Sequence, residues 1–346
     1  MSFNWAKTPR PIVALAPMAG VSDAPFRRII KKLASEAIVY SEFVSTNALS
    51  MGSKKTLRML AYEPEVERPL IVQVFGADPK KFIEACKIIE DLGADAIDIN
   101  MGCPAAKIVS SLYGSALMKK PELAAELVAS VVKAISIPVS VKTRLGWDSS
   151  DALIPFCKKL VAAGASALAV HGRTYTQKFS GTADWVPIYE LKNEVSVPVI
   201  GNGDIMSAAD AVSKIGNLDG VMIGRGAVGN PWLISEICYA LRVTRSSLPG
   251  ITRNPSAPLR ASPERATRNE SSALGGLISF KEKIPFILEH CRLAVAEKGE
   301  ERGMREMRRH LANYVRGIPG AAGLRAKLVR VERICEVEEI LSGVTV

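Results

Sequence analysis

Histidine is scarce in this sequence, and its cysteines show no paired spacing. The 346 residues include only three histidines, and the six cysteines form no C-x-x-C pair, standing at positions 86, 103, 157, 238, 291 and 335. Structural zinc sites draw four ligands from these residue types at close spacings. The pattern therefore argues against a zinc site and favours reduced thiols, as in a cytoplasmic protein.

Long apolar runs and targeting signals are missing as well. No run of 18 apolar residues is present that would span a bilayer, and the N-terminal segment MSFNWAKTPR lacks the basic and then apolar pattern of a signal peptide. We expect a soluble cytoplasmic protein that makes no membrane contact.

Acidic residues are fewer than basic ones, 35 against 45, which gives a formal net charge of +10. A basic surface favours a polyanionic partner such as nucleic acid, although basic proteins without that function are common. The apolar share is 48%, which suffices for one core of about 250 residues plus a smaller domain. We expect two domains.

Short β-branched and apolar runs predict eight strands, at residues 11–17, 37–43, 70–76, 96–102, 138–144, 167–173, 198–204 and 220–226. Most of these runs are followed by a helical pattern, and three such patterns begin at Asp23, Asp78 and Lys120. Eight alternating units are typical of a parallel (β/α)₈ TIM barrel. No G-x-G-x-x-G motif follows the first run, which argues against a Rossmann dinucleotide domain.

The remainder of the chain has a different character. Residues 243–279 are rich in Ser, Pro, Arg, Thr and Asn, which predicts a flexible basic linker or insertion. From residue 280 onward helical periodicity returns without strand signals. We therefore expect an α/β barrel domain over residues 1–242, a linker over 243–279 and a small all-helical domain over 280–346.

Polar residues gather at the C-terminal ends of the predicted strands, where the catalytic groups of such barrels project. They are Gln73, Asn100, Cys103, Lys142, Arg144, His171, Arg173, Asn202, Asp204 and Arg225. A single polar residue there could be structural, but this many on one rim predicts a shared active site.

Cys103 stands out within this set. A free cysteine is most often buried as a small apolar side chain. Cys103, however, lies in a turn directly after an apolar run, within the segment DINMGCP and between Gly102 and Pro104. We expect its thiol to face the space above the strand ends.

Two glycine-rich segments follow the last two predicted strands, GNGD at 201–204 and GRG at 224–226. Glycine at these loops lets backbone N–H groups approach a phosphate closely, and Arg225 would add a charge-assisted contact. A pocket of this kind suits a sugar phosphate or a flavin mononucleotide (FMN).

The rest of the rim favours the flavin. Pro17 and Met18 offer apolar surface to a flat ring, and Gln73 offers an amide that matches the ring's donor and acceptor edge. Lys142 would place positive charge where a reduced flavin accumulates negative charge. His171 would hydrogen-bond the same edge or a phosphate oxygen.

Several motifs in this order resemble those of the tRNA-dihydrouridine synthases, in particular the bacterial B-type branch: APMAGVSDAPFR, DINMGCPAAK, GSALM, VKTRLGW, HGRT, ADW, PVIGNGDI and DGVMIGRGAVGNPW. The resemblance covers residues 10–242 and, more loosely, the helical tail. It implies an FMN-dependent barrel that reduces particular uridines of tRNA to 5,6-dihydrouridine, with NADPH as the usual reductant. NADPH over NADH rests on the resemblance alone.

The resemblance also implies roles for individual residues. The family's flavin positions fall on Pro17, Met18, Ala19, Gln73, Lys142, His171, Asn202, Gly203, Asp204, Gly224 and Arg225. Cys103 falls on the proton donor, so that flavin N5 would deliver hydride to C6 of the uracil and the Cys103 thiol a proton to C5. A cysteine thiol with the ordinary pKa of about 8.5 is largely protonated at neutral pH, which suits a general acid. Asn100 and Arg144 fall on uridine contacts, and we expect Arg173 to contact the substrate too.

A uridine inside folded tRNA must be turned out to reach such a site. The helical tail is the expected RNA contact, because arginines recur there at helical spacing, and we expect Arg305 and Arg308 to bind tRNA. Acidic residues at 300, 301 and 306 dilute this charge. The loop 105–116 would close over the uridine, with Lys107 near the phosphate backbone and Gly114 as a hinge.

Two alternatives stay open beside this interpretation. One is an FMN barrel that acts on a small molecule, such as a dihydroorotate- or dihydropyrimidine-type dehydrogenase, which would not need the basic tail. The other is an RNA-binding barrel without catalysis, against which the presence of Cys103, Lys142 and His171 argues. The linker is longer than the family's usual connection and would act as a spacer or add unspecific RNA affinity. The family suggests a monomer without a stable protein partner.

Overall fold

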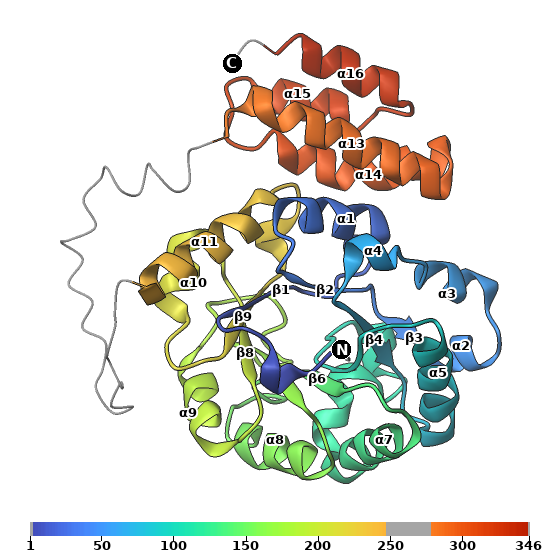
Figure 1. The fold of residues 1–346 in the computed structure, drawn as a ribbon, viewed down its shortest axis with the longest axis vertical. Coiled ribbons are helices and arrows are strands. Elements are labelled where there is room, and N and C mark those ends of the chain that lie inside the picture. The colour runs from blue at the N-terminus through green and yellow to red at the C-terminus, as the bar shows by residue number, and fades with distance from the viewer. Residues whose placement is uncertain (1–2, 247–277, 345–346) are drawn as a thin grey trace.

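The structure, a computed structural model, describes residues 3–246 and 278–344 (Figure 1). Its single parallel sheet closes into a barrel, because β1 pairs with β9 and β2 pairs with β4. The barrel strands are β1 (Ile12–Leu15), β2 (Ile38–Tyr40), β4 (Leu70–Phe75), β5 (Ala96–Met101), β6 (Val139–Arg144), β7 (Ala167–His171), β8 (Val199–Asn202) and β9 (Gly220–Ile223). A short strand, β3 (Val44–Ser45), adds to the edge of β4. The prediction of a TIM barrel is confirmed.

Helices surround the barrel (Figure 1). Those that follow strands on the outside are α1 (Ala24–Leu33), α5 (Pro79–Asp91), α7 (Pro121–Ala134), α8 (Leu153–Ala162), α9 (Val186–Glu194), α10 (Ala208–Lys214) and α11 (Trp232–Ser246). Smaller helices lie in the connections: η1 (Trp5–Lys7), α2 (Thr46–Ser50), α3 (Lys54–Met59), α4 (Pro64–Glu67), α6 (Ala106–Val109), η2 (Gly114–Lys119) and η3 (Arg225–Ala227).

The sequence determines where several helices begin. The Asp23 carboxylate accepts from the N–H of Phe26, and the Asp78 carboxylate accepts from the N–H of Lys80, so both residues cap a helix as expected. Pro79 occupies the first position of α5, where its missing N–H costs nothing. The third expected start, Lys120, is the N-cap of α7, without a side-chain capping bond.

The inside of the barrel is filled by small and branched side chains. Ala14, Ala96, Ala167 and Ala169 belong to this inner cluster, together with larger residues such as Ile200. Trp5 and Phe3 pack against its members, so the N-terminal segment covers one end of the barrel (Figure 1). The other end, where the strands finish, is left for the loops.

The C-terminal helices form a second unit with a core of its own (Figure 1). They are α13 (Phe280–Lys298), α14 (Glu300–Tyr314), α15 (Ala321–Leu328) and α16 (Ile334–Ser342). Ser279 and Glu282 form a capping box at the start of α13, which is a strong helix-start signal. Helix α11 continues to Ser246, four residues past the boundary expected at 242; residues 247–277 of the expected linker lie outside the described residues.

Helix α1 makes one of the contacts between the two units. Lys298 of α13 bonds to the carboxylates of Asp23 and Glu306, and its side chain is 8% exposed. Phe26 lies 4.6 Å from the His310 ring and 5.5 Å from the His290 ring, centroid to centroid. The helical unit is therefore fixed to the barrel through both charge and ring packing.

Among the helices of residues 3–246 and 278–344, none combines the length and apolar character needed to cross a bilayer.

A buried ion pair joins α1 to α4. The Nε atom of Arg27 lies 2.7 Å from the carboxylate of Glu67, and the two side chains are 1% and 0% exposed. Glu67 also accepts from Arg28 and from the N–H of Glu63. We predict that Glu67→Gln lowers the free energy of unfolding by about 3–5 kcal/mol, because it leaves the Arg27 charge buried and unpaired. Urea unfolding followed by circular dichroism measures the change.

Glu65→Gln, at an exposed position of the same helix, is the matched control and should change stability by less than about 0.5 kcal/mol. Equal free energies of unfolding for the two variants would contradict a stabilising role of the ion pair between Arg27 and Glu67.

The buried histidines make the contact between the units sensitive to acid. Burial lowers the pKa of His310 to about 4 and holds the pKa of His290 well below its ordinary value. The unfolded chain therefore binds protons first, so this stability is fully present above pH of about 6.5 and is lost as the pH falls toward 4. We predict that His310→Gln shows a shallower loss of stability than wild type between these values, measured by urea unfolding at several pH values. Carboxylates titrate alike in both proteins, so parallel curves would contradict the prediction.

Candidate active site

A cavity of about 770 Å³ opens at the C-terminal ends of the barrel strands. The structure brings most of the expected site residues to its wall: Pro17, Met18, Ala19, Gln73, Asn100, Cys103, Lys142, Arg144, His171, Asn202, Gly203, Asp204, Gly224 and Arg225. Strand register explains this gathering, because Asn100 is paired with Lys142, and His171 with both Arg144 and Asn202, on neighbouring strands.

A buried carboxylate begins a row of hydrogen bonds along the wall. Asp98 is fully buried and accepts from Gln73 Nε2 and from Ser140 Oγ, both at 2.7 Å. Gln73 Oε1 in turn accepts from Asn100 Nδ2 at 2.9 Å. Burial raises the pKa of Asp98 to about 6. The row fixes which end of the Gln73 amide points to which neighbour.

The same row ends at the turn that carries Cys103. Asn100 Oδ1 accepts from the backbone N–H groups of Gly102 at 3.0 Å and of Cys103 at 2.9 Å. The Cys103 carbonyl accepts from the N–H of Ser115 at 3.2 Å. Asn100 thus holds the turn, a role that its spacing from Cys103 did not reveal, and the Cys103 thiol is half-buried at the cavity wall.

Lys142 supplies a half-buried positive charge. Its Nζ atom donates to Asn202 Oδ1 at 3.3 Å, and Asn202 is oriented by its own bond to the carbonyl of Met222 at 2.7 Å. Burial, followed by the nearby Arg144, lowers the pKa of Lys142 to about 8, while Asp98 opposes this shift. Lys142 therefore remains mostly charged at neutral pH.

Arg144 links the Cys103 turn to the loop after β7. Its guanidinium donates to the carbonyls of Gly102 at 2.7 Å, Lys178 at 2.7 Å and Thr174 at 3.1 Å. Burial lowers the pKa of Arg144 to about 10. Three of its five donors are thus used within the protein, which leaves two for a ligand.

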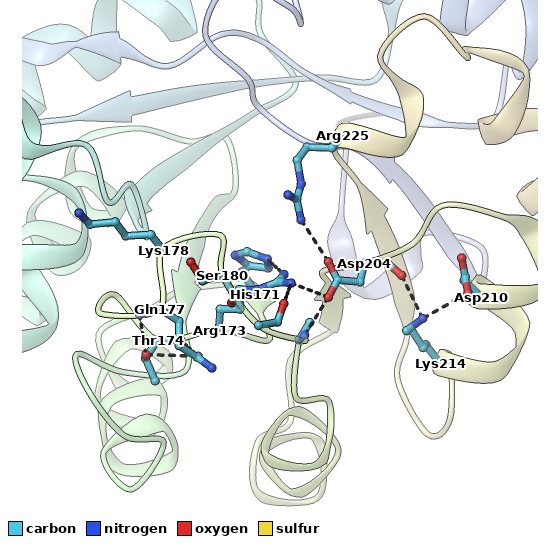
Figure 2. Close-up of polar contacts among 12 residues, drawn as sticks. His171, Arg173, Thr174, Gln177, Lys178, Ser180, Asp204, Asp210, Lys214 and Arg225 are labelled. Atoms are coloured by element: carbon cyan, nitrogen blue, oxygen red, sulfur yellow. Dashed lines mark hydrogen bonds and ion pairs between the residues drawn. The ribbon is translucent and has the colours of Figure 1, made fainter. Parts of the chain in front are cut away.

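A cluster of charges lies at the ends of β7, β8 and β9 (Figure 2). The Asp204 carboxylate bonds to Arg173 at 2.6 Å and to Arg225 at 3.1 Å, and it also accepts from the N–H of Ala183. Arg173 is nearly buried, donates to the carbonyls of Ser180 and Gly181, and is not among the residues that line the cavity. The structure therefore places Arg173 behind the wall, where it supports Asp204.

The backbone at this corner is shaped for an anion. Gly203 has φ of 127° and Asp204 has φ of 50°, and a Cβ atom on Gly203 would lie 2.7 Å from the Cβ of Ala183. Within the described residues, the N–H groups of Asp204 and Ile205 donate to no protein acceptor. Unpaired N–H groups at a cavity wall are suited to phosphate oxygens.

His171 is neutral in this setting. Burial, reinforced by Lys142 and three arginines, lowers the pKa of His171 to about 2. Arg173 Nη1 lies 3.4 Å from His171 Nε2 and is always protonated, so Nε2 acts as the acceptor. The ring proton is then on Nδ1, which makes His171 a donor at that atom.

The expected RNA-binding residues lie apart from the cavity. Arg308 of α14 donates to the carbonyls of Val331 and Arg330 within its own unit, and Arg305 is 3.5 Å from Glu301. Arg309 of the same helix reaches the barrel and donates to the carbonyls of Ala19 and Gly20. Lys107 is part of α6, and its side chain lies outside what the structure describes.

Two contributors to the site were missed at the level of the sequence. Asp98 is an acidic residue inside an otherwise apolar strand, two positions before Asn100, and that spacing put both on one face. Phe179 is 57% exposed at the cavity wall, with the guanidinium groups of Arg144 and Arg225 at 5.4 and 5.5 Å from its ring. An exposed aromatic in a polar loop was the available signal.

Comparison with known proteins agrees with this arrangement. The family model described as "Dihydrouridine synthase (Dus)" matches residues 14–344. The chain belongs to the dihydrouridine synthase family. It is 38% identical over 321 residues to "tRNA-dihydrouridine synthase B" of Pseudomonas aeruginosa and 37% identical over 316 residues to "Probable tRNA-dihydrouridine synthase" of Rickettsia bellii. These alignments cover 92% and 90% of this chain, and 88% of each relative.

Solved structures share the barrel with this member of the dihydrouridine synthase family. Histamine dehydrogenase from Rhizobium sp. 4-9 matches with a TM-score of 0.52 and 13% identity over 66% of this chain and 45% of that one. A 2-naphthoyl-CoA reductase matches with a TM-score of 0.53 and 11% identity over 68% and 52%. At such identities the likeness concerns the fold alone.

The exposure of the thiols provides a test of the site. Cys103 is half-buried and Cys335 is exposed, whereas Cys86, Cys157, Cys238 and Cys291 are buried. We predict that Ellman's reagent titrates two thiols in the folded protein and six after unfolding, because buried thiols are out of its reach. Cys335→Ser should leave one reactive thiol, and Cys103→Ser in the same protein should leave none. A Cys335→Ser protein without a reactive thiol would contradict the placement of Cys103 at the cavity wall.

Proposed function

We propose that this protein is an FMN-dependent enzyme that reduces uridines of tRNA to 5,6-dihydrouridine with NADPH or NADH as the reductant. The observation that carries the proposal is that Cys103 lines the same cavity as the eleven residues at the family's flavin positions. Membership of the family supports the reaction. The match to the family model also extends through the helical unit, and a dehydrogenase of small molecules would not need that unit.

The cavity fits the flavin on its own terms. Met18 and Met222 offer apolar surface for a ring, and Gln73 keeps one N–H and one lone pair for its polar edge. The unpaired N–H groups of Asp204 and Ile205, with Arg225 beside them, suit the phosphate. Lys142 would place its charge beside the ring.

When bound, FMN supplies the hydride that adds to C6 of the uracil. The Cys103 thiol holds a proton at Sγ and donates it to C5, which completes the reduction of the double bond. Asn100 keeps the Cys103 turn in place. The positive charges of Lys142 and Arg144 stabilise the negative charge that develops on the uracil. Phe179 adds an aromatic face to the cavity wall beside Arg144 and Arg225.

The tRNA would bind across the barrel rim and the helical unit. The net charge of +10 attracts the polyanion. Arg305 is the better candidate for a phosphate contact of the two expected residues, because its side chain is 60% exposed and its partner Glu301 is 93% exposed. Arg308 uses its donors within the helical unit, so it would contribute mainly by packing.

The decisive experiment separates proton donation from flavin chemistry. We predict that Cys103→Ala lowers dihydrouridine formation by about 10²–10⁴-fold while the purified protein keeps its flavin and its rate of flavin reduction by NADPH. Mass spectrometry of tRNA nucleosides and stopped-flow absorbance measure the two. Cys335→Ala should match wild type in both. A wild-type protein without flavin absorbance, or a fully active Cys103→Ala variant, would refute the proposal.

A further inference from the structure

A second cavity, of about 230 Å³, lies where the barrel meets the helical unit. It shares Met206, Arg225 and Gly226 with the larger cavity, so the two adjoin. The barrel contributes the segment between β9 and α11, and the helical unit contributes the remaining wall: Lys283, Asn313, Tyr314 and Arg316. We refer to it as the junction cavity.

Positive charge dominates the junction cavity. Three cations line it, Arg225, Lys283 and Arg316, and no carboxylate is among its lining residues. Arg225 is partly neutralised by Asp204, and Lys283 interacts with Glu236 nearby. The guanidinium of Arg316 has no partner among the described residues. A wall of this composition favours an anion.

The barrel side adds hydrogen-bond donors. Trp232 is 2% exposed and lines the cavity, and its Nε1 atom donates to no described acceptor. A buried N–H without a partner is destabilising, and a bound acceptor would remove that penalty. Trp232 is also the first residue of α11, a helix of 15 residues whose N-terminus carries partial positive charge.

Tight packing holds the two sides together. Gly229 has φ of 64°, and a Cβ atom there would lie 2.4 Å from the Cβ of Asn313 and 2.8 Å from the carbonyl oxygen of His310. Lys283 lies 5.0 Å above the Trp232 ring. The cations of the helical unit are therefore held beside the barrel loop before any ligand arrives.

We propose that the junction cavity binds a phosphate ester of a ligand that also occupies the main cavity. The inference rests on the proposed function, which supplies two ligands with such a group: the backbone of tRNA and the 2′-phosphate of NADPH. Both would present oxygens to Lys283, Arg316 and Trp232 Nε1. Phosphate would thus be recognised at the interface between the barrel and the helical unit.

The test uses the holoenzyme with Arg316→Gln and Lys283→Gln, and with Lys281→Gln as the matched control. Lys281 is exposed on the same helix α13, two residues before Lys283, and does not line the junction cavity. If tRNA is the source, each cavity variant weakens tRNA binding about tenfold and lowers the salt slope by about one, measured by fluorescence anisotropy at several salt concentrations. If NADPH is the source, flavin reduction by NADPH slows about tenfold while reduction by NADH is unchanged.

The control should match wild type in both measurements, and Arg316→Lys should restore part of the effect. Unchanged tRNA binding and unchanged flavin reduction in both cavity variants would overturn the inference and leave the proposed function intact. Loss of flavin from these variants would also overturn the inference. Inorganic phosphate provides a readout that is independent of activity. It should raise the melting temperature of wild type and of Lys281→Gln more than that of Arg316→Gln, and equal shifts in all three would overturn the inference.

Discussion

The position of Cys103 depends on a row of hydrogen bonds that starts at a buried carboxylate. Asp98 orients Gln73, Gln73 orients Asn100, and Asn100 holds the N–H of Cys103. Each member would be costly to bury alone, but every one has a partner. The row therefore couples the Cys103 turn to buried side chains of the barrel strands. The proton donation proposed for Cys103 requires this kind of fixed position.

Charge in the site is arranged around a second carboxylate. Asp204 offsets one of the two positive charges of Arg173 and Arg225, while Lys142 and Arg144 have no comparably close acidic partner among the described residues. The cavity is consequently positive even though one corner is paired. Burial lowers the pKa of both Lys142 and His171. Because the ordinary pKa of lysine is much higher than that of histidine, Lys142 stays mostly charged while His171 stays neutral.

Much of this arrangement follows from local sequence patterns. The eight apolar runs and the caps at Asp23 and Asp78 depend on near neighbours, and the polar residues at strand ends meet because parallel strands end on one side of a barrel. Such local patterns do not predict contacts between residues that are far apart in the sequence. Arg308 bonds to carbonyls more than twenty residues away, and the junction cavity joins residues near 230 to residues near 315. The family resemblance predicts a uridine contact for Asn100, which stays a prediction, but no local pattern shows that its side chain also bonds to Gln73 and to the N–H groups of Gly102 and Cys103.

The contact of Arg309 with the carbonyls of Ala19 and Gly20 has a consequence for how the enzyme is built. The segment it touches continues directly from Pro17 and Met18, which form a wall of the main cavity. The C-terminal unit therefore supports this wall of the barrel through Arg309. A barrel without the C-terminal unit would lose this support, so the shape of the main cavity depends on both units.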